Sequence, residues 1–138
     1  MERSVDKIVH YVFSTYKRKQ VLVGKISQEL EGIIKNICEE KGFQLICQSI
    51  LTEHVHLLIR KRFLDRNEYV MKVIKGISSR LLFKKYPSNR LEFRKLWGRG
   101  YRANEVKDDG HLKQVIEYIK GQKLNGIDKR YFSLETRE

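Results

Sequence analysis

Residues 52–60 read TEHVHLLIR, a stretch with the two-residue periodicity of a β-strand. Side chains of a strand alternate between its two faces, so the aliphatic residues at positions 55, 57 and 59 share one face and are expected to lie against helices. His54 and His56 share the opposite face and are next-but-one neighbours. The stretch therefore predicts a sheet with one apolar face and a second face that carries two imidazoles.

The regions on either side of this strand supply the other elements of a single α+β domain, residues 1–138. The sequence predicts strands at residues 5–14, 43–51, 55–60 and 101–106, and helices at about 27–41, 65–86 and 111–124. The first six elements have the order of a ferredoxin-like split β-α-β arrangement, which is an antiparallel sheet with two helices on one face. The second face of the sheet is then free unless another segment covers it.

Local signals predict where the first two helices begin and end. Ser27 is the expected N-cap of the first helix, and Gly42 is expected to end it. Asp65 and Glu68 have the spacing of a capping box for the second helix, and Pro87 disfavours helix at the residue before it. The predicted core stripe of this helix is Val70, Val73, Ile74, Ile77 and Leu81, with Lys72 and Lys75 on the opposite face.

Length and composition describe a folded protein. The chain has 138 residues, of which 41% are hydrophobic and 10% aromatic, enough for a core. No uncharged run approaches the ~20 residues that span a bilayer, and residues 1–4 lack the apolar region of a signal peptide. Cys38 and Cys47 lack a paired-cysteine metal or redox spacing, and we interpret them as small buried hydrophobes. A cytosolic protein is expected.

The positive charge is concentrated in one part of the chain. The net charge is +12, and residues 60–102 carry 14 Lys and Arg against 3 Asp and Glu, a net charge of +11. Such segregation is typical of a surface for a polyanion. This region lacks the long one-sided apolar stripe of a membrane-surface helix, which favours nucleic acid over an anionic membrane.

Two features each have a functional interpretation and a purely structural one. His54 and His56 are within reach of one divalent metal ion, or they are polar residues on a solvated sheet face. Tyr118 lies ~110° from the centre of the apolar stripe of the last helix, on a polar flank one turn before Gln122. It is a nucleophile, a stacking platform for a base, or an ordinary half-exposed tyrosine.

In combination, these motifs resemble a known family. His54-Val55-His56 is similar to the histidine–hydrophobe–histidine signature of single-strand DNA nucleases. The segment from Tyr118 to Gln122 resembles the Tyr-x-x-x-Gln helix motif of single-tyrosine transposases of the insertion-sequence-200 type. Residues 75–80 (KGISSR) and 96–101 (LWGRGY) are similar to the central block of that family, and the resemblance covers about residues 5–125.

The resemblance implies a metal-dependent transposase that cleaves and rejoins single-stranded DNA. It implies that His54, His56 and Gln122 bind Mg²⁺ or Mn²⁺ and that Tyr118 is the nucleophile, which forms a 5′-phosphotyrosyl intermediate. The phenol must be activated, and His111 and Lys120 are the nearby candidates in sequence. The resemblance also implies a homodimer in which the tyrosine helix of one subunit serves the histidines of the other. DNA with hairpins at element ends is the expected substrate, in the nucleoid of a prokaryotic cell.

The basic region supplies the expected DNA contacts. Candidate phosphate contacts are Arg60, Lys61, Arg62, Lys72, Lys75 and Arg80. Trp97 and Tyr101 are candidate stacking platforms for unpaired bases, and Trp97 has the alternative of anchoring its loop in the core.

Two departures from the family pattern and two rival functions stay open. Glu53 stands where the family often has Asp, and residues 102–107 replace a more apolar segment. The related transposase associated with repetitive extragenic palindromes shares the same motifs. The rivals are a non-catalytic RNA-recognition-like module, and a metal-dependent nuclease that activates water. A covalent protein–DNA adduct separates the tyrosine route from both.

Overall fold

A computed structural model describes residues 6–87 and 95–125 of the chain, and it describes residues 123–125 as backbone only. The elements, in chain order, are β1 (Lys7–Ser14), the 3-10 turn η1 (Tyr16–Arg18), α1 (Gly24–Lys41), β2 (Gln44–Ile50), β3 (His54–Lys61), α2 (Asn67–Lys85), β4 (Arg102–Val106) and α3 (Asp109–Asn125). Residues 1–5, 88–94 and 126–138 lie outside the described residues, and they include the first residue of the predicted strand 5–14 and part of the predicted basic segment.

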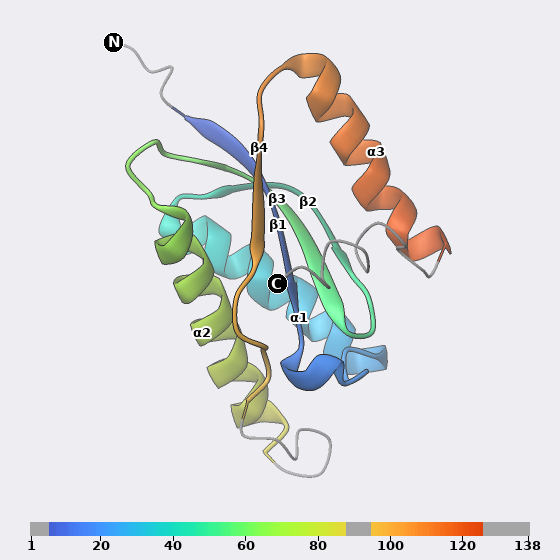
Figure 1. Ribbon diagram of the computed structural model, residues 1–138. Helices are drawn as coiled ribbons and strands as arrows, with labels where there is room; N and C mark the ends of the chain where they lie inside the picture. The colour runs from blue at the N-terminus through green and yellow to red at the C-terminus, as the bar shows by residue number, and fades with distance from the viewer. Residues whose placement is uncertain (1–5, 88–94, 126–138) are drawn as a thin grey trace.

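The four strands form one antiparallel sheet in the order β2-β3-β1-β4. The predicted α+β class and split β-α-β arrangement are therefore confirmed, with β4 as an edge strand beside β1. In Figure 1 the sheet lies between α2 on the left and α3 on the right. Among the described residues, no helix is long and apolar enough to cross a membrane.

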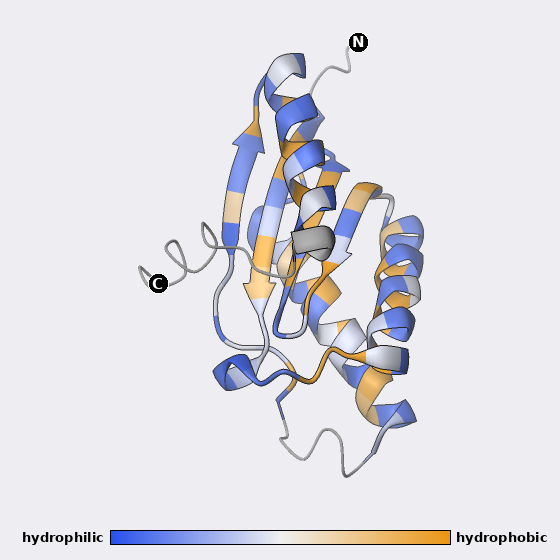
Figure 2. Cartoon of the chain, turned by 90° about the vertical axis from the view of Figure 1, so that its right-hand side faces the viewer, coloured by the Kyte–Doolittle hydropathy of each residue, from blue (hydrophilic) through white to orange (hydrophobic). Residues whose placement is uncertain are grey.

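The face of the sheet that packs on α1 and α2 holds the main core. Tyr11, Phe13 and Leu57 on the central strands are fully buried there, together with Ile34 of α1 and Ile74 of α2. Figure 2 shows the helices with hydrophilic residues on their outer sides and hydrophobic residues towards the sheet. Burying one large aliphatic side chain of this kind contributes about 1.5–3 kcal/mol to stability. The alternation along β3 thus predicts its core face correctly.

The predicted start of the first helix is wrong by about one turn. The helix begins at Gly24, after Val23, and no side chain of Val23 caps it. Gly24 has φ +56°, a left-handed conformation that glycine adopts without steric cost, and it turns the extended chain into the helix before Ser27 is reached. The predicted end is confirmed, because Gly42 has φ +80° and its N–H donates to the carbonyls of Cys38 and Glu39.

The capping box predicted for the second helix does not form. The helix begins at Asn67 without a side-chain cap on Arg66. The Asp65 carboxylate instead accepts a hydrogen bond from Arg62 Nε at 2.9 Å, and the Asp65 carbonyl accepts one from the buried Lys61 Nζ at 2.6 Å. These contacts fix Asp65 in the loop that precedes the helix.

The inner face of α2 differs from the predicted stripe at its far end. Val70 and Ile74 are fully buried as expected, but Leu82 rather than Leu81 is the buried leucine. Ser78, four residues before Leu82, is also fully buried, and its hydroxyl accepts a hydrogen bond from the indole of Trp97. A polar residue therefore occupies a core position of this helix that hydrophobicity alone does not reveal.

Candidate active site

His54 and His56 lie on the face of β3 opposite the main core, as the alternation predicts. Each side chain is only 1% exposed, and the two ring centroids are 5.0 Å apart. The interpretation of the pair as polar residues on a solvated face is therefore wrong. Something covers this face of the sheet.

The cover is α3, which packs across the sheet face that the ferredoxin-like arrangement leaves open. Leu58 of β3, Val106 of β4 and Ile119 of α3 form a second, smaller buried cluster there. Figure 2 shows α3 in front of the strands, on the side from which that view is taken. Because α3 is anchored by Ile119, it holds the neighbouring Tyr118 against the histidines.

Tyr118 is half-buried beside the histidine pair of its own chain. Its ring meets the ring of His56 edge to face, with centroids 5.7 Å apart. Gln122 follows one turn later and is 5% exposed; its Nε2 donates to the Tyr118 carbonyl at 2.9 Å. One chain thus places Tyr118 beside the histidine pair, and Gln122 follows one turn later on the same helix.

His10 is a residue of this site that the sequence reasoning missed. Its Nε2 lies 3.0 Å from Nδ1 of His56, a buried hydrogen bond that needs one ring to donate and the other to accept. The two rings stack with centroids 5.2 Å apart, and the His10 ring lies 6.1 Å from that of Tyr118. The signal was present, because His10 alternates with Val9 and Tyr11 and so falls on the histidine face of a strand that neighbours β3.

Glu53 orients the other histidine. Its Oε2 accepts hydrogen bonds from His54 Nδ1 at 3.1 Å and from Arg18 at 2.9 Å, while Thr52 donates to Oε1. Burial favours the neutral acid, but the hydrogen bond and charge of His54 and the charge of Arg18 outweigh it and lower the pKa of Glu53 below its ordinary value. An ionised Glu53 that accepts from Nδ1 leaves the lone pair of His54 on Nε2, as in histidines that bind metals.

The donor atoms present fit a divalent metal. Nε2 of His54, Nε2 of His56 and Oε1 of Gln122 are all buried, and none of these three atoms makes a hydrogen bond within the described part of the chain. Imidazole nitrogen and amide oxygen are ordinary ligands for divalent ions. No cluster of three His, Cys, Asp or Glu side chains with metal-binding geometry occurs in residues 6–87 and 95–125. The third ligand that the resemblance implies, Gln122, is an amide and falls outside these residue types.

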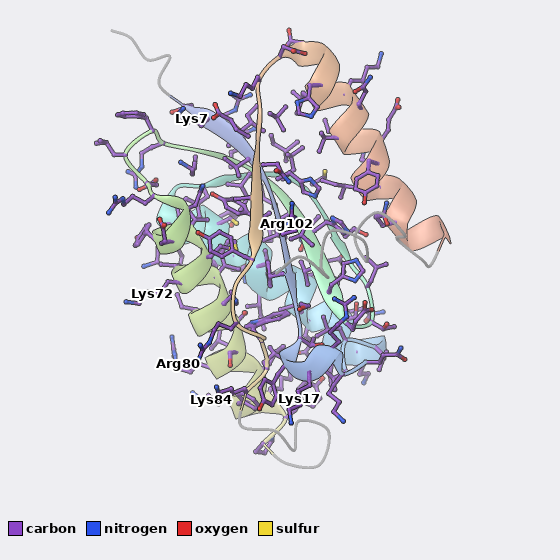
Figure 3. The ribbon with its side chains drawn as sticks, in the orientation of Figure 1. Lys7, Lys17, Lys72, Arg80, Lys84 and Arg102 are labelled. Carbon is purple, nitrogen blue, oxygen red and sulfur yellow. The ribbon has the colours of Figure 1, made fainter. Side chains whose placement is uncertain are left out.

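The predicted phosphate contacts on α2 lie away from the histidine pair. Lys72 and Arg80 are exposed along the outer side of α2, with Lys84 one turn further on (Figure 3). Lys75 is engaged within the protein, because its Nζ donates to the carbonyls of Gly98 and Gly100, both at 2.9 Å. On β3 and after it, Arg60 is half-buried, Lys61 is buried and Arg62 pairs with Asp65 at the surface.

Trp97 takes the second of its two expected positions, in the core. It is 7% exposed, meets Phe13 edge to face at 4.8 Å between centroids, and donates from Nε1 to Ser78 Oγ at 3.0 Å. Tyr101 is half-buried and its ring lies 6.4 Å from that of Tyr11. The two segments that resemble the central block of the family therefore contact each other through Lys75 and Ser78.

The two candidates for activating the phenol are both exposed. His111 is exposed, two turns before Tyr118 on α3, and Lys120 is exposed on the same helix. The rings next to Tyr118 are those of His56 and His10.

Comparisons with known proteins identify the family of the chain. The family model described as "Transposase IS200 like" matches residues 4–122. The ISDra2 transposase TnpA of Deinococcus radiodurans is 30% identical over 115 residues, which cover 82% of this chain and 81% of that protein. The transposase for insertion sequence element IS200 of Salmonella typhimurium is 25% identical over 115 residues, which cover 82% of this chain and 74% of that protein.

Two solved structures share the fold. The crystal structure of a Deinococcus radiodurans R1 protein assigned as a transposase has a TM-score of 0.70 at 25% identity and covers 88% of this chain and 96% of its own. A REP-associated tyrosine transposase bound to a REP hairpin has a TM-score of 0.64 at 15% identity and covers 92% of this chain and 74% of its own. The match of the family model to most of the chain, together with a 30% identical transposase, establishes that the chain belongs to the family of IS200-like transposases.

Proposed function

We propose that this transposase cleaves and rejoins single-stranded DNA by transesterification at Tyr118, with a divalent metal, Mg²⁺ or Mn²⁺, held by His54, His56 and Gln122. The observation that carries the proposal is the position of the Tyr118 ring, 5.7 Å from the ring of His56 within one chain. A nucleophile and two metal-ligand side chains so close together can act on one phosphodiester.

The reaction exchanges one phosphodiester for another. Tyr118 Oη attacks the phosphorus in line, the bond from phosphorus to the 3′ oxygen breaks, and the 5′ phosphate stays on the tyrosine. The phenol proton leaves to a base, for which His111 and Lys120 are the candidates, and the 3′ oxygen takes up a proton. His54, His56 and Gln122 would hold a divalent ion that, when bound, would polarise and orient the phosphodiester. The covalent link conserves the energy of the bond, so attack by a 3′-hydroxyl rejoins DNA without an external source.

Neighbouring residues orient the two histidines and Tyr118. Glu53 accepts from His54 Nδ1, and His10 Nε2 shares a hydrogen bond with His56 Nδ1, so the Nε2 atom of each ring is the one left to bind a metal. Ile119 packs into the sheet and limits the freedom of Tyr118. Holding the reacting groups in place removes an entropic part of the activation barrier.

The test is a denaturing gel that detects a covalent protein–DNA band. Single-stranded DNA bearing a hairpin is incubated with the protein and Mn²⁺, with and without chelator. We expect a slow band that requires metal and is lost in Tyr118→Phe, while Tyr118→Phe still binds DNA. Tyr69→Phe is the matched control, because Tyr69 is an exposed tyrosine on α2 and its loss leaves the band unchanged. Cleavage without the band would favour the water-using nuclease, and binding without cleavage by the wild type would favour the non-catalytic module.

DNA recognition is proposed to use the basic region together with the site. The REP-associated relative was solved with a REP hairpin, which supports hairpin-bearing DNA as the substrate class. The exposed cations Arg62, Lys72 and Arg80 are the phosphate contacts that best suit this role, with Arg60, Lys61 and Lys75 held closer to the protein. Because phosphate contacts release counterions, binding should weaken steeply with salt. An affinity that is flat between low and high salt would contradict this part of the proposal.

We also propose a homodimer, in which Tyr118 of one chain serves the histidines of the other, in the nucleoid of a prokaryotic cell. The decisive experiment mixes Tyr118→Phe chains with His56→Ala chains, neither of which forms the adduct alone. Recovery of the covalent band in the mixture requires a tyrosine and a histidine pair from different chains. No recovery, with a mixed dimer present by light scattering, would assign both groups to one chain.

A further inference from the structure

Arg102 lies on the same cross-sheet row as the histidines. In the strand register Arg102 pairs with Val12, and Val12 pairs with His56, so the three side chains point to the same face. With neighbouring strands about 4.8 Å apart, the backbone of Arg102 is about 10 Å from that of His56. Asn104 pairs with His10 in the next row. The edge strand β4 therefore aims an arginine and an amide at the sheet face that carries the active site.

A cleft connects these residues to the tyrosine. It lies between β4 and α3, has a volume of about 870 Å³, and is lined by residues that include His56, Tyr118, Arg102, Asn104 and Gln114. This volume is within the range of about 300–1,000 Å³ that is typical of ligand sites. The cleft is therefore large enough to hold part of a strand next to the phosphodiester at Tyr118.

The chemistry of the cleft favours an anion. Two cations, Arg102 and Lys107, and one acid, Glu105, line the cleft, and the Glu105 carboxylate pairs with Lys7 Nζ at 3.4 Å. Arginine presents a planar fork of donors that matches the oxygens of a phosphate. Figure 3 shows Arg102 at the middle of the molecule, apart from the row of Lys72, Arg80 and Lys84 on α2. It is thus a cation of the active-site face, separate from the outer basic surface.

We propose that the cleft between β4 and α3 is a subsite for the single-stranded DNA that flanks the scissile phosphate, and that Arg102 binds a backbone phosphate of that strand. The proposal rests on the proposed function, since it takes the strand at Tyr118 as the substrate.

The test is equilibrium binding, so that it does not depend on the chemistry. A fluorescein-labelled 12-residue oligothymidine is titrated by anisotropy at several salt concentrations, in chelator and with all variants in the Tyr118→Phe background. Arg102→Ala should weaken binding about tenfold at low salt, as expected for a charge-assisted phosphate contact. It should also reduce the slope of log K against log salt by about 0.7, the value for one phosphate of a single strand. Lys25→Ala, which removes one exposed charge from α1, is the matched control and should leave the slope unchanged.

Thermal unfolding separates binding from folding. If Arg102→Ala lowers the melting temperature, Arg102→Gln keeps most of the side-chain volume and replaces it in the titration. A well-folded variant at position 102 with the wild-type affinity and salt slope would overturn the proposal, as would an equal loss in Lys25→Ala. If the variant at position 102 loses affinity for DNA but the wild-type protein forms no covalent adduct, the subsite is retained and the transesterification is overturned.

Discussion

Replacing His10 with alanine tests whether this residue positions the metal ligand His56. The substitution removes the partner of a buried hydrogen bond of 3.0 Å and leaves His56 Nδ1 in a site where the His56 side chain is 1% exposed. A buried polar atom that loses its partner costs about 1–3 kcal/mol. Loss of the group that orients a metal-binding histidine typically costs about 10–100-fold in metal affinity. The expected result is therefore a loss of Mn²⁺ affinity in that range.

The assay is titration calorimetry with Mn²⁺, with thermal unfolding measured on the same samples. His10→Gln retains an amide that can accept from or donate to His56 Nδ1, and it should recover part of the affinity. A residue with a merely structural role would lower the melting temperature without this recovery. His111→Ala is the matched control, because His111 is an exposed histidine on α3. Wild-type affinity in a folded His10→Ala protein would refute the positioning role.

Three further predictions concern the packing around the site. Ser78→Ala leaves the buried indole N–H of Trp97 without its acceptor and should cost about 1–3 kcal/mol in urea unfolding; an unchanged midpoint would contradict the hydrogen bond. Gly98→Ala places a Cβ 3.3 Å from the Thr15 carbonyl oxygen, so we expect a lower melting temperature, and an equal one would show that the backbone gives way. Burial raises the pKa of the Cys38 thiol to about 12, which removes the reactive thiolate at pH 8. A thiol-specific disulfide reagent should therefore modify Cys38 only after unfolding. Rapid modification of Cys38 in the native protein would be inconsistent with its burial.

The sheet and its two faces were predictable because they depend on local alternation. The aliphatic positions of β3 and the histidines between them assign both faces without knowledge of any partner. The element order then restricts the topology to few choices, of which the split β-α-β arrangement is the observed one. Tyr118 was also placed correctly off the apolar stripe of its helix, since it is half-buried while Ile119 is fully buried.

The details that failed depend on contacts that a local pattern does not contain. Ser27 and Asp65 have suitable side chains for caps, but Gly24 and the Arg62–Asp65 pair determine where the helices begin. The His10–His56 contact requires two strands 46 residues apart in the chain to lie side by side. Ser78 is a core position only because Trp97 reaches it from a loop. Each of these depends on tertiary structure, which overrides local propensity.

The position of α3 bears directly on the proposed dimer. In the single chain α3 already buries Ile119 against Leu58 and holds Tyr118 at the histidines. If two chains exchange this helix, each copy meets the same sheet face on its partner, so the apolar burial and the ring contacts are the same in both arrangements. Only residues 107 and 108 connect β4 to α3, and a connection this short favours exchange when it is strained in the closed chain. The active-site contacts contribute equally to the two arrangements, so the balance between them depends on protein concentration and on this connection.

Inserting three glycines after Lys107 relaxes the connection, so mixtures of Tyr118→Phe and His56→Ala chains that carry the insertion should recover less adduct than mixtures without it. Equal recovery would show that the connection does not control which histidines the tyrosine serves.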